Sequence, residues 1–319
     1  MPKILVTGGA GYIGSITVWH LLKRGFDVLV ADDLSRGHLD AVPPHRLNVV
    51  RLQDTAAVAK LLAGVDAVVH FAAYIAVGES TRDPELYFAN NVGGSLYQFE
   101  AMARASVKRL VFSSTAAVYG EPPLSPIPED SPFAPVSPYG ESKAMVERVL
   151  GQLDKYRGVR SVILRYFNAC GAEPEAMLGE RHDPETHLIP LLFQAAMTGE
   201  PVQLFGDDYT TPDGTCVRDY IHVGDLASAH IAALDRLLAG GPSCQFNVGT
   251  GTGNTVLEVL RAVEEISGRK VPYKIAPRRD GDSPSLVANS QKLQQTLGWK
   301  PVRSDLKQIV RDAWEFFVT

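Results

Sequence analysis

The chain has 319 residues, a formal net charge of −5 and a pI near 5.9. This length suits one large domain or a large and a small one. An acidic chain gives no electrostatic reason to expect binding to nucleic acid or to an anionic membrane. The sequence shows no signal-peptide pattern and no apolar run of transmembrane length. Cys170, Cys216 and Cys244 form no C-x-x-C pair, which favours a reduced cytoplasmic compartment.

The first apolar run, residues 3–7, predicts a buried parallel strand, and a helix ending near Gly25 follows it. Between them lies a glycine-rich loop, in which the glycines allow a tight turn, close approach of the backbone to a pyrophosphate, and close helix–strand packing. A Gly-x-x-Gly-x-x-Gly pattern alone also fits an ordinary strand-to-helix turn. The predicted cofactor contacts in this loop are Gly8, Gly11, Tyr12, Ile13 and Gly14.

The second predicted strand, residues 27–31, ends at Asp32. A carboxylate at this distance from the loop is placed to hold the ribose hydroxyls of adenosine, and its charge disfavours a 2′-phosphate. The pattern therefore favours NAD over NADP, with Asp33 and Ser35 as further contacts. Arg36, beside these acids, leaves some tolerance of NADP open.

Strands and helices alternate through the rest of the first half. The predicted strands are residues 47–52, 67–72, 109–114 and 161–167, and the predicted helices are residues 55–63, 84–105 and 138–156. This pattern is typical of an α/β fold with a doubly wound parallel sheet of the Rossmann type, whose ligand site lies beyond the carboxyl ends of the strands. The second half has shorter elements and many loops, but residues 220–249 read as a helix and a strand that return to the sheet. The predicted domains are 1–168 plus 220–249 for the nucleotide and 169–219 plus 250–319 for a smaller α/β lid domain.

Tyr139 and Lys143 are about one turn apart on one face of the predicted helix 138–156. Pro138 suits a helix start, and Ser137 suits its N-cap. Free tyrosine ionises near pH ~10, and a neighbouring ammonium favours the phenolate. A Y-x-x-x-K pair alone is more often a solvated helix edge. Here it accompanies a nucleotide loop and a polar strand end, so we expect Tyr139 to accept a proton from a sugar or alcohol hydroxyl.

These features together closely resemble the extended short-chain dehydrogenase/reductase family, over residues 3 to about 314. Within that family the similarity is to epimerases that act at C4 of UDP-hexoses, which implies an isomerase. The motifs that carry the resemblance are TGGAGYIGS (7–15), HFAA (70–73), NN (90–91), SSTAAVYG (113–120), SPYGESK (137–143), RYFNACGA (165–172), DGTCVRDYIHV (213–223) and RRDGD (278–282).

The resemblance implies a catalytic set of Tyr139, Lys143 and Thr115. Tyr139 is then the base, Lys143 lowers its pKa and binds the nicotinamide ribose, and Thr115 hydrogen-bonds the sugar O4. Threonine replaces the serine often found at this position but keeps the hydroxyl. In such enzymes the C4 hydride moves to NAD, and the 4-keto sugar turns while it is held through its diphosphate. The hydride then returns to the other face, so NAD stays tightly bound and is regenerated in each turnover.

The resemblance also implies further contacts. Arg218 and Arg279 suit bidentate binding of phosphates, Phe205 lies along the uracil, and Asp282 accepts from the uridine ribose. A surface salt bridge between Arg218 and Asp219 remains an alternative. The further cofactor contacts are Leu52, Phe71, Ala72, Ala73, Asn91, Ser113, Tyr139, Lys143 and Phe167. The substrate contacts are Thr115, Tyr139, Asn168, His187, Leu188, Gln203, Phe205, Arg218, Tyr220, Arg279, Asp282 and Leu286.

Other chemistries of this fold fit less well. A nucleotide-sugar 4,6-dehydratase carries an acid and a base immediately after the Ser/Thr, where this chain has Ala116 and Ala117, and a UDP-glucuronate decarboxylase usually has glutamate in place of Ala117. A non-catalytic NAD sensor would not need the three catalytic residues together, and a dehydrogenase would accumulate NADH with UDP-glucose. Arg51 replaces the carboxylate expected near adenine, and Ile75 stands where some members have lysine toward the pyrophosphate.

Several other side chains suggest a structural role. His182 and His187 flank acidic residues, but the loop is rich in proline and acids, and no closed ligand set is apparent. We therefore predict a solvated loop and no metal site. Cys170 is expected to be a packing residue, and His70 a buried structural histidine.

Two expectations concern assembly and substrate range. The helices 84–105 and 138–156 carry more apolar positions than one sheet face needs, and in relatives two such helices pair across a two-fold axis. We therefore expect a homodimer. Leu286 lies where the family has a side chain near the sugar C2 substituent, although it also reads as ordinary strand packing. A leucine there predicts slower but measurable turnover of UDP-N-acetylglucosamine.

Overall fold

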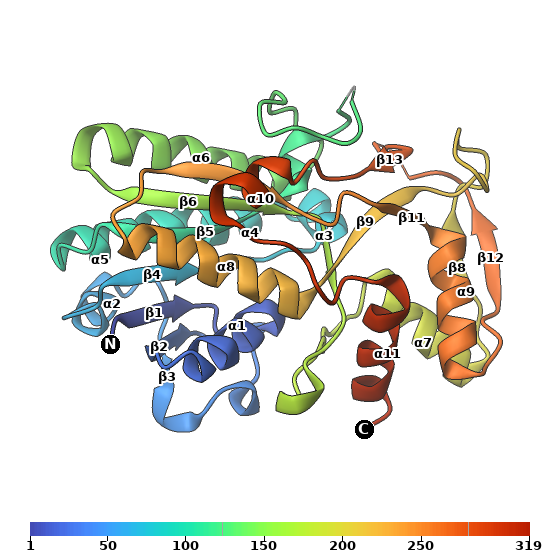
Figure 1. Cartoon of the computed structure of the whole chain (residues 1–319), viewed down its shortest axis with the longest axis horizontal. Helices are drawn as coiled ribbons and strands as arrows, with labels where there is room; N and C mark the ends of the chain where they lie inside the picture. The colour runs from blue at the N-terminus through green and yellow to red at the C-terminus, as the bar shows by residue number, and fades with distance from the viewer. Residues whose placement is uncertain (123, 280) are drawn as a thin grey trace. The chain divides into compact units, whose positions relative to one another are not determined.

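The computed structural model describes residues 1–122, 124–279 and 281–319, and it divides into two compact units (Figure 1). The first unit comprises Met1–Gly120, Phe133–Arg165 and Ala227–Phe246, and the second comprises Glu121–Pro132, Tyr166–Leu226 and Asn247–Thr319. The predicted domain bounds assign residues 121–132, 166–168, 220–226 and 247–249 differently and stay a prediction. In the described part of the chain, no helix is long and apolar enough to cross a membrane.

The first unit is built on a seven-stranded sheet of order β10-β6-β5-β4-β1-β2-β3. Its strands are β1 (Lys3–Thr7), β2 (Asp27–Asp32), β3 (Leu47–Val49), β4 (Ala67–His70), β5 (Arg109–Thr115), β6 (Arg160–Tyr166) and β10 (Cys244–Val248). β1 pairs in parallel with both β2 and β4. The chain order runs outward in both directions from β1 and β4, so the topological switch point lies between them. The predicted doubly wound fold is confirmed.

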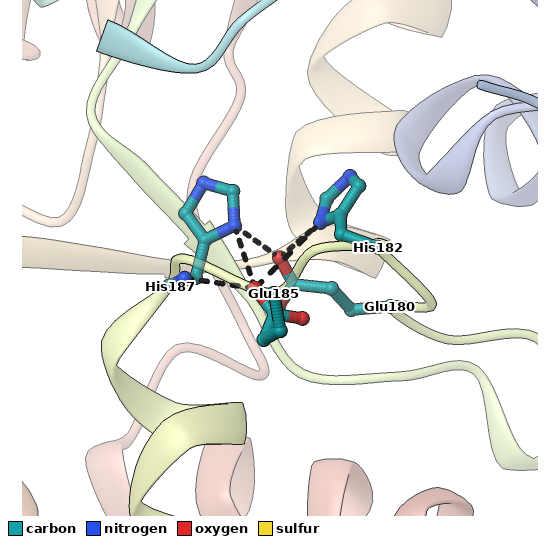
Figure 2. Close-up of side chains that lie close together, drawn as sticks. All are labelled: Glu180, His182, Glu185 and His187. Atoms are coloured by element: carbon teal, nitrogen blue, oxygen red, sulfur yellow. Dashed lines mark hydrogen bonds and ion pairs between the residues drawn. The ribbon is translucent and has the colours of Figure 1, made fainter. Parts of the chain in front are cut away.

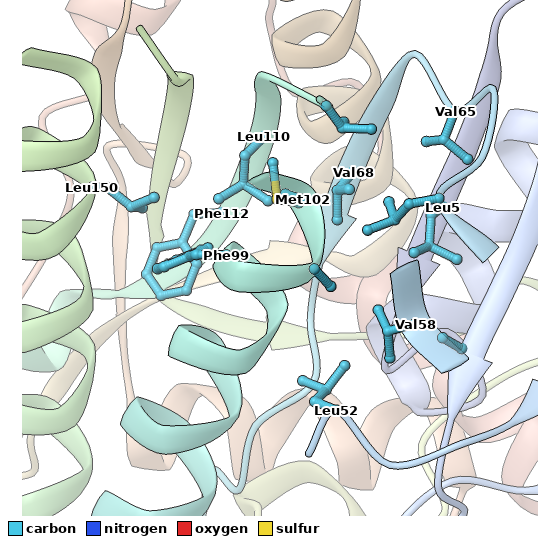
Figure 3. Packing of buried hydrophobic residues seen from close by; sticks show 14 of the residues in the cluster. Leu5, Leu52, Val58, Val65, Val68, Phe99, Met102, Leu110, Phe112 and Leu150 are labelled. Atoms are coloured by element: carbon cyan, nitrogen blue, oxygen red, sulfur yellow. The ribbon is translucent and has the colours of Figure 1, made fainter. Parts of the chain in front are cut away.

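Helices of the first unit cover the sheet and form its core. They are α1 (Tyr12–Lys23), α2 (Thr55–Leu61), α3 (Val77–Arg82), α4 (Pro84–Tyr87), α5 (Gly94–Arg104), α6 (Pro138–Arg157) and α8 (Val223–Leu238), with short turns η1 (Leu39–Ala41), η2 (Pro44–Arg46) and η4 (Ala116–Tyr119). Figure 3 shows part of the core, where α2, α5 and α6 bury Val58, Phe99 and Leu150 against strand residues such as Leu110. Near-continuous apolar strands need such cover on both faces.

Two predicted elements differ from those observed by more than two residues or by an interruption. The expected strand 47–52 ends at Val49, at the edge of the sheet, and Leu52 lies beyond it in the hydrophobic core. The expected helix 84–105 is interrupted by a π-helical segment, η3 (Phe88–Gly93), between α4 and α5. This wide turn carries Asn91, whose buried amide bonds to the backbone of Tyr74 and to Ser142 Oγ. Those bonds explain why the regular helix gives way here.

The second unit contains smaller sheets and a helical core. β9 (Val217–His222) pairs with β7 (Asn168–Cys170), β11 (Gly253–Thr255) and β13 (Ser285–Leu286), while β8 (Val202–Phe205) pairs with β12 (Tyr273–Ala276). Its helices are α7 (Leu188–Thr198), α9 (Val256–Ser267), α10 (Gln291–Leu297) and α11 (Leu306–Phe317), with the turn η5 (Pro174–Ala176). Phe193 of α7 packs against Trp314 and Phe317 of α11, which fixes one helix on the other. As predicted for 220–249, α8 and β10 return the chain to the large sheet, where β10 pairs with β6.

Candidate active site

The glycine loop after β1 has the geometry that its sequence predicts. Gly8 has a φ of +68°, and a Cβ on it would lie 2.5 Å from the backbone nitrogen of Ala72. A Cβ on Gly14 would lie 2.2 Å from the carbonyl oxygen of Gly8. Larger residues at these two positions would therefore push apart the ends of β1 and β4 or the turn itself. This close approach brings Phe71–Ala73 beside the loop, at the switch point.

The start of α1 is suited to an anion. Gly11 is its N-cap residue and provides no side-chain hydrogen bond to the first turn. The first backbone N–H groups of a helix lack intrahelical partners, and the helix dipole adds partial positive charge there. An uncapped helix of this length behind a glycine turn fits the diphosphate of a dinucleotide.

Asp32 joins the glycine loop to the end of β2. Its carboxylate accepts hydrogen bonds from the backbone N–H groups of Ala10 and Leu34, both at 2.9 Å. Burial raises the pKa of Asp32, against the opposing effect of these two bonds. The next carboxylate, on Asp33, accepts from the N–H of Ser35 at 2.9 Å. Arg36, which left NADP tolerance open, pairs with Glu79 at 2.7 Å.

The start of α6 is docked onto the carboxyl end of β5. As predicted, Ser137 caps α6 by accepting from the N–H of Gly140. A Cβ on Gly140 would lie 2.6 Å from the carbonyl oxygen of Ala117, two residues beyond Thr115. Lys143 Nζ donates to the carbonyl oxygen of Ser113 at 2.9 Å. Both contacts bring the first turns of α6, and with them Tyr139, to the strand end that carries Thr115.

The catalytic candidates are all largely buried. Tyr139 is 7% exposed, Thr115 8% and Lys143 3%. Thr115 Oγ1 accepts from the N–H of Ala117 at 3.1 Å, which leaves its hydroxyl hydrogen available to donate. Burial lowers the pKa of Lys143 to about 7, and the nearby charge of Glu147 opposes that shift. The lysine therefore carries only part of its charge at neutral pH unless an additional anion is nearby.

A buried ion-pair network lies one helical turn beyond Lys143. Glu147 and Arg165 are in contact at 2.6 Å, with side chains 3% and 5% exposed. Ser114 donates to Glu147 at 2.5 Å, and Arg165 donates to the Tyr119 hydroxyl at 2.8 Å. Sequence reasoning missed this network, although Glu147 repeats the four-residue spacing of Tyr139 and Lys143 and so lies on the same inward face.

Asn91 and His70, also in the first unit, are buried and make hydrogen bonds within the fold. The amide of Asn91 is occupied by Tyr74 and Ser142, as described above. His70 is 1% exposed and contacts Thr7 Oγ1 at 2.6 Å and Ser95 Oγ at 3.1 Å, which confirms the predicted buried histidine. Burial lowers its pKa to about 3, so its ring is neutral at physiological pH.

In the second unit, Arg218 contacts Asp282 rather than Asp219. Arg218 also donates to the carbonyl oxygen of Ser283 at 2.9 Å. Asp219 is fully buried, and its oxygens accept from Thr250, Gly251 and Ala288. The alternative of an Arg218–Asp219 salt bridge is therefore wrong, because neighbouring strand residues point to opposite faces. Two predicted substrate contacts, Arg218 and Asp282, pair with each other in this structure.

Arg279 and Phe205 also meet, although they lie far apart in sequence. The guanidinium carbon of Arg279 lies 3.9 Å from the centroid of the Phe205 ring, a cation–π contact. β8 pairs with β12 with Phe205 opposite Ala276, which brings the segment after β12 to the end of β8. Gln203 is exposed on the same strand. Asp280 of the RRDGD motif lies outside the described residues.

The remaining substrate candidates of the second unit fall on or beside β9. Asn168 of β7 lies opposite Tyr220 and donates to the carbonyl oxygen of Asp219 at 3.0 Å. Leu286 of β13 lies opposite Arg218 and is half-buried. Tyr220 is 6% exposed. The structure therefore places Leu286 next to the arginine that is predicted to bind phosphate.

Four residues of the loop before α7 are exposed, namely Arg181, Asp183, Pro184 and Thr186, so the predicted solvation holds for only part of the loop. Glu180 and Glu185 each have side chains 8% exposed, and they lie with His182 and His187 in one cluster (Figure 2). Although burial opposes the imidazolium, the two carboxylates raise the pKa of His187 to about 10. Sequence reasoning found no closed ligand set here because it left out Glu180, which lies two residues before His182 and joins the cluster.

Comparisons with known proteins agree with this geometry. Residues 4–249 match the model of the NAD dependent epimerase/dehydratase family. The chain is 47% identical over 317 residues to UDP-glucose 4-epimerase of Lacticaseibacillus casei, covering 98% of this chain and 96% of that protein. The crystal structure of UDP-glucose 4-epimerase from Brucella ovis in complex with NAD superposes with a TM-score of 0.97 at 42% identity, covering 99% and 98% of the two chains. The UDP-Glc/GlcNAc 4-epimerase of Campylobacter jejuni gives a TM-score of 0.87 at 40% identity, covering 100% and 99%.

Proposed function

We propose that this chain, which belongs to the NAD dependent epimerase/dehydratase family, is a UDP-glucose 4-epimerase that interconverts UDP-glucose and UDP-galactose. One observation carries the proposal. The docking of α6 on β5 brings Tyr139 and Lys143 to Thr115, while Ala116 and Ala117 follow Thr115. This site has a proton acceptor for a sugar hydroxyl but lacks the acid–base pair that elimination would need.

Thr115, Tyr139 and Lys143 each have a separate role in the proposed reaction. Thr115 holds the O4 hydroxyl, and Tyr139 takes its proton as C4 is oxidised to the ketone. Lys143 supplies positive charge near the phenol and, by resemblance, binds the nicotinamide ribose. NAD, when bound, supplies the acceptor and donor of the C4 hydride. After the 4-keto sugar has turned, Tyr139 returns the proton to O4 and the configuration is inverted.

The cofactor is expected to remain bound through turnover, because the reaction has no net redox change. The glycine turn, the uncapped start of α1 and the buried Asp32 support its retention. Asp32→Ala is expected to purify with less NAD and to lose more on dialysis. A wild-type protein that needs stoichiometric added NAD as oxidant would contradict this part of the proposal.

The uridine diphosphate is proposed to contact the second unit. Arg218 and Arg279 provide guanidinium forks, and Phe205 provides an aromatic face for the base. Binding at Arg218 requires exchange of its contact with Asp282 for one with phosphate, which also frees a carboxylate for the ribose hydroxyls. The half-buried Leu286 beside Arg218 supports slow acceptance of N-acetylated sugars.

We also propose a cytoplasmic homodimer. Leu96 and Tyr97 of α5 are 47% and 41% exposed, and Met145 of α6 is 38% exposed. Such apolar exposure on two neighbouring helices suits an isologous helical interface. The three free cysteines support a reducing compartment. Light scattering at micromolar concentration is expected to give twice the 34.6 kDa chain mass, and a monomer would refute the dimer.

The function is tested by incubating the purified chain with UDP-galactose, without added cofactor, and resolving the nucleotide sugars. We expect conversion to an equilibrium mixture with UDP-glucose and no net NADH. A 4-keto-6-deoxy product would instead identify a dehydratase, and steady NADH accumulation with UDP-glucose would identify a dehydrogenase. Either result would overturn the proposal.

A further inference from the structure

The loop that leads into α7 gathers two imidazoles and two carboxylates at one point. Ligand atoms from Glu180, His182, Glu185 and His187 all lie within 4.8 Å of one another, as Figure 2 shows. We infer that these four residues form a structural binding site for one divalent transition-metal ion of the zinc class. No part of the proposed reaction uses this site, so the inference stands apart from the proposed function.

The spacing of the four donor atoms fits a tetrahedral ion. His187 Nδ1 lies 2.7 Å from Glu180 Oε1 and 3.4 Å from Glu185 Oε1, and His182 Nδ1 lies 3.0 Å and 4.0 Å from the same two oxygens. Zinc bonds to nitrogen and oxygen of about 2.0–2.1 Å place the ligand atoms of a tetrahedron about 3.4 Å apart. The observed separations lie on both sides of that value, so small side-chain rotations would suffice.

The His187 contact is not an ordinary hydrogen bond. Its Nδ1 atom is buried and has no hydrogen-bond partner, even though Glu180 Oε1 lies within ion-pair distance. The nitrogen lies between two carboxylate oxygens, 2.7 Å from Glu180 Oε1 and 3.4 Å from Glu185 Oε1. As the N-cap residue of α7, His187 also makes no side-chain hydrogen bond to the helix, so its ring is not needed there. A buried nitrogen that faces other donors is what a metal ligand requires.

The carboxylates are buried and held in place. Both glutamate side chains are 8% exposed, and Glu185 Oε1 accepts from the N–H groups of Thr186 and His187 at 2.6 and 2.8 Å. Bonds of this kind orient the ligands of metal sites. Two buried negative charges require a compensating cation, and a divalent ion supplies both charges at once. Protonation of both histidines would also supply them, which is the competing explanation that the experiment must separate.

The donor types indicate the class of metal. Two imidazoles with two carboxylates suit zinc and its neighbours better than magnesium or calcium, which prefer oxygen alone. Four protein donors complete a tetrahedron and leave no position for a reacting molecule, which indicates a structural site. The ion would fasten the chain from Glu180 to the first turn of α7. Under this inference His187 is a metal ligand rather than the substrate contact predicted from sequence.

The test uses the full-length, tag-free chain after treatment with a chelator. Titration with Co²⁺ is expected to give one ion per chain and the intense visible absorption of tetrahedral cobalt, and Zn²⁺ should displace it. X-ray absorption of the zinc-loaded protein should show four nitrogen or oxygen ligands, two of them imidazole. Sub-stoichiometric binding, octahedral cobalt spectra or sulfur ligation would overturn the inference, and these measurements need no variant.

Variants then assign the ligands. His182→Ala and the milder Glu180→Gln should each weaken Co²⁺ binding by at least tenfold and abolish the rise in melting temperature that Zn²⁺ produces. His45→Ala is the matched control, because His45 is an exposed histidine of the first unit. It should bind Co²⁺ as the parent chain does. Unchanged binding in both cluster variants would show that the four residues form only a proton-compensated ion-pair cluster.

Discussion

The two units hold their candidate functional residues in different ways. In the first unit, Tyr139 and Lys143 lie on one long helix that is capped by Ser137 and fastened to β5 by the bond from Lys143 to Ser113. In the second unit, Arg218 forms an ion pair with Asp282, and Arg279 lies over the ring of Phe205. The first set is organised before any ligand arrives, whereas the second must exchange protein contacts for ligand contacts. Substitutions should therefore affect the chemical step in the first unit and binding in the second.

The largest effect is expected for Tyr139→Phe, which deletes only the proton acceptor. We expect kcat to fall by at least ~100-fold, the usual scale of general base catalysis, while bound NAD and UDP-sugar affinity stay close to those of the parent. Steady-state kinetics and the absorbance of the released cofactor measure both quantities. Near-normal turnover by this variant would remove the basis of the proposed mechanism.

The next effect concerns stability, and it tests whether the first unit depends on its buried network. Glu147→Gln leaves the Arg165 charge buried without its partner, which is expected to lower the free energy of unfolding by about 3–5 kcal/mol. Glu100→Gln is the matched control, since its ion pair with Arg104 is exposed on α5, and it should cost at most about 0.5 kcal/mol. Equal losses in urea denaturation would show that the buried pair has no special role.

A smaller effect, confined to binding, is expected in the second unit. Arg218→Lys keeps the charge but loses the planar fork, so KM for UDP-galactose should rise by about tenfold while kcat changes little. Arg278→Lys is the control, because Arg278 pairs with the exposed Asp208. If both variants raise KM equally, or if Arg218→Lys lowers kcat instead, the division between the two units is wrong.

The smallest effect concerns substrate range. Leu286→Ser should raise turnover of UDP-N-acetylglucosamine relative to UDP-glucose, and Leu286→Tyr should lower it, each by about tenfold at most. The ratio of the two activities, measured in parallel, is the readout. A ratio that neither substitution changes would make Leu286 an ordinary packing residue of β13.

The same contrast explains which parts of the site the sequence predicts. The glycine turn, Asp32 and the Tyr139–Lys143 pair are local patterns whose spacing follows directly from strand and helix geometry. The fold class follows from the same alternation of elements. Two departures within the first unit are the π-helical turn at Asn91 and the network around Glu147. They depend on contacts with Tyr74 and Arg165, which are 17 and 18 residues away and belong to other elements.

In the second unit, tertiary contacts decide most of the arrangement. Arg218 and Asp282 are 64 residues apart, so no local pattern indicates that they pair. The cluster before α7 was missed for a different reason. Its four residues are close in sequence, but only the folded loop shows that Glu180 joins them. Proline and acidic composition suggested solvent exposure, which Asp183 and Pro184 show but the side chains of Glu180 and Glu185 do not.

The central claim is that a hydride leaves C4 and returns to the same carbon within one turnover. UDP-galactose deuterated at C4, incubated with the purified protein in ordinary water, tests this most directly. We predict that the UDP-glucose formed keeps its deuterium at C4, as mass spectrometry and proton NMR of the product would show. Loss of the deuterium to solvent would contradict the account, because it would mean that C4 exchanges a proton with water instead of a hydride within the site.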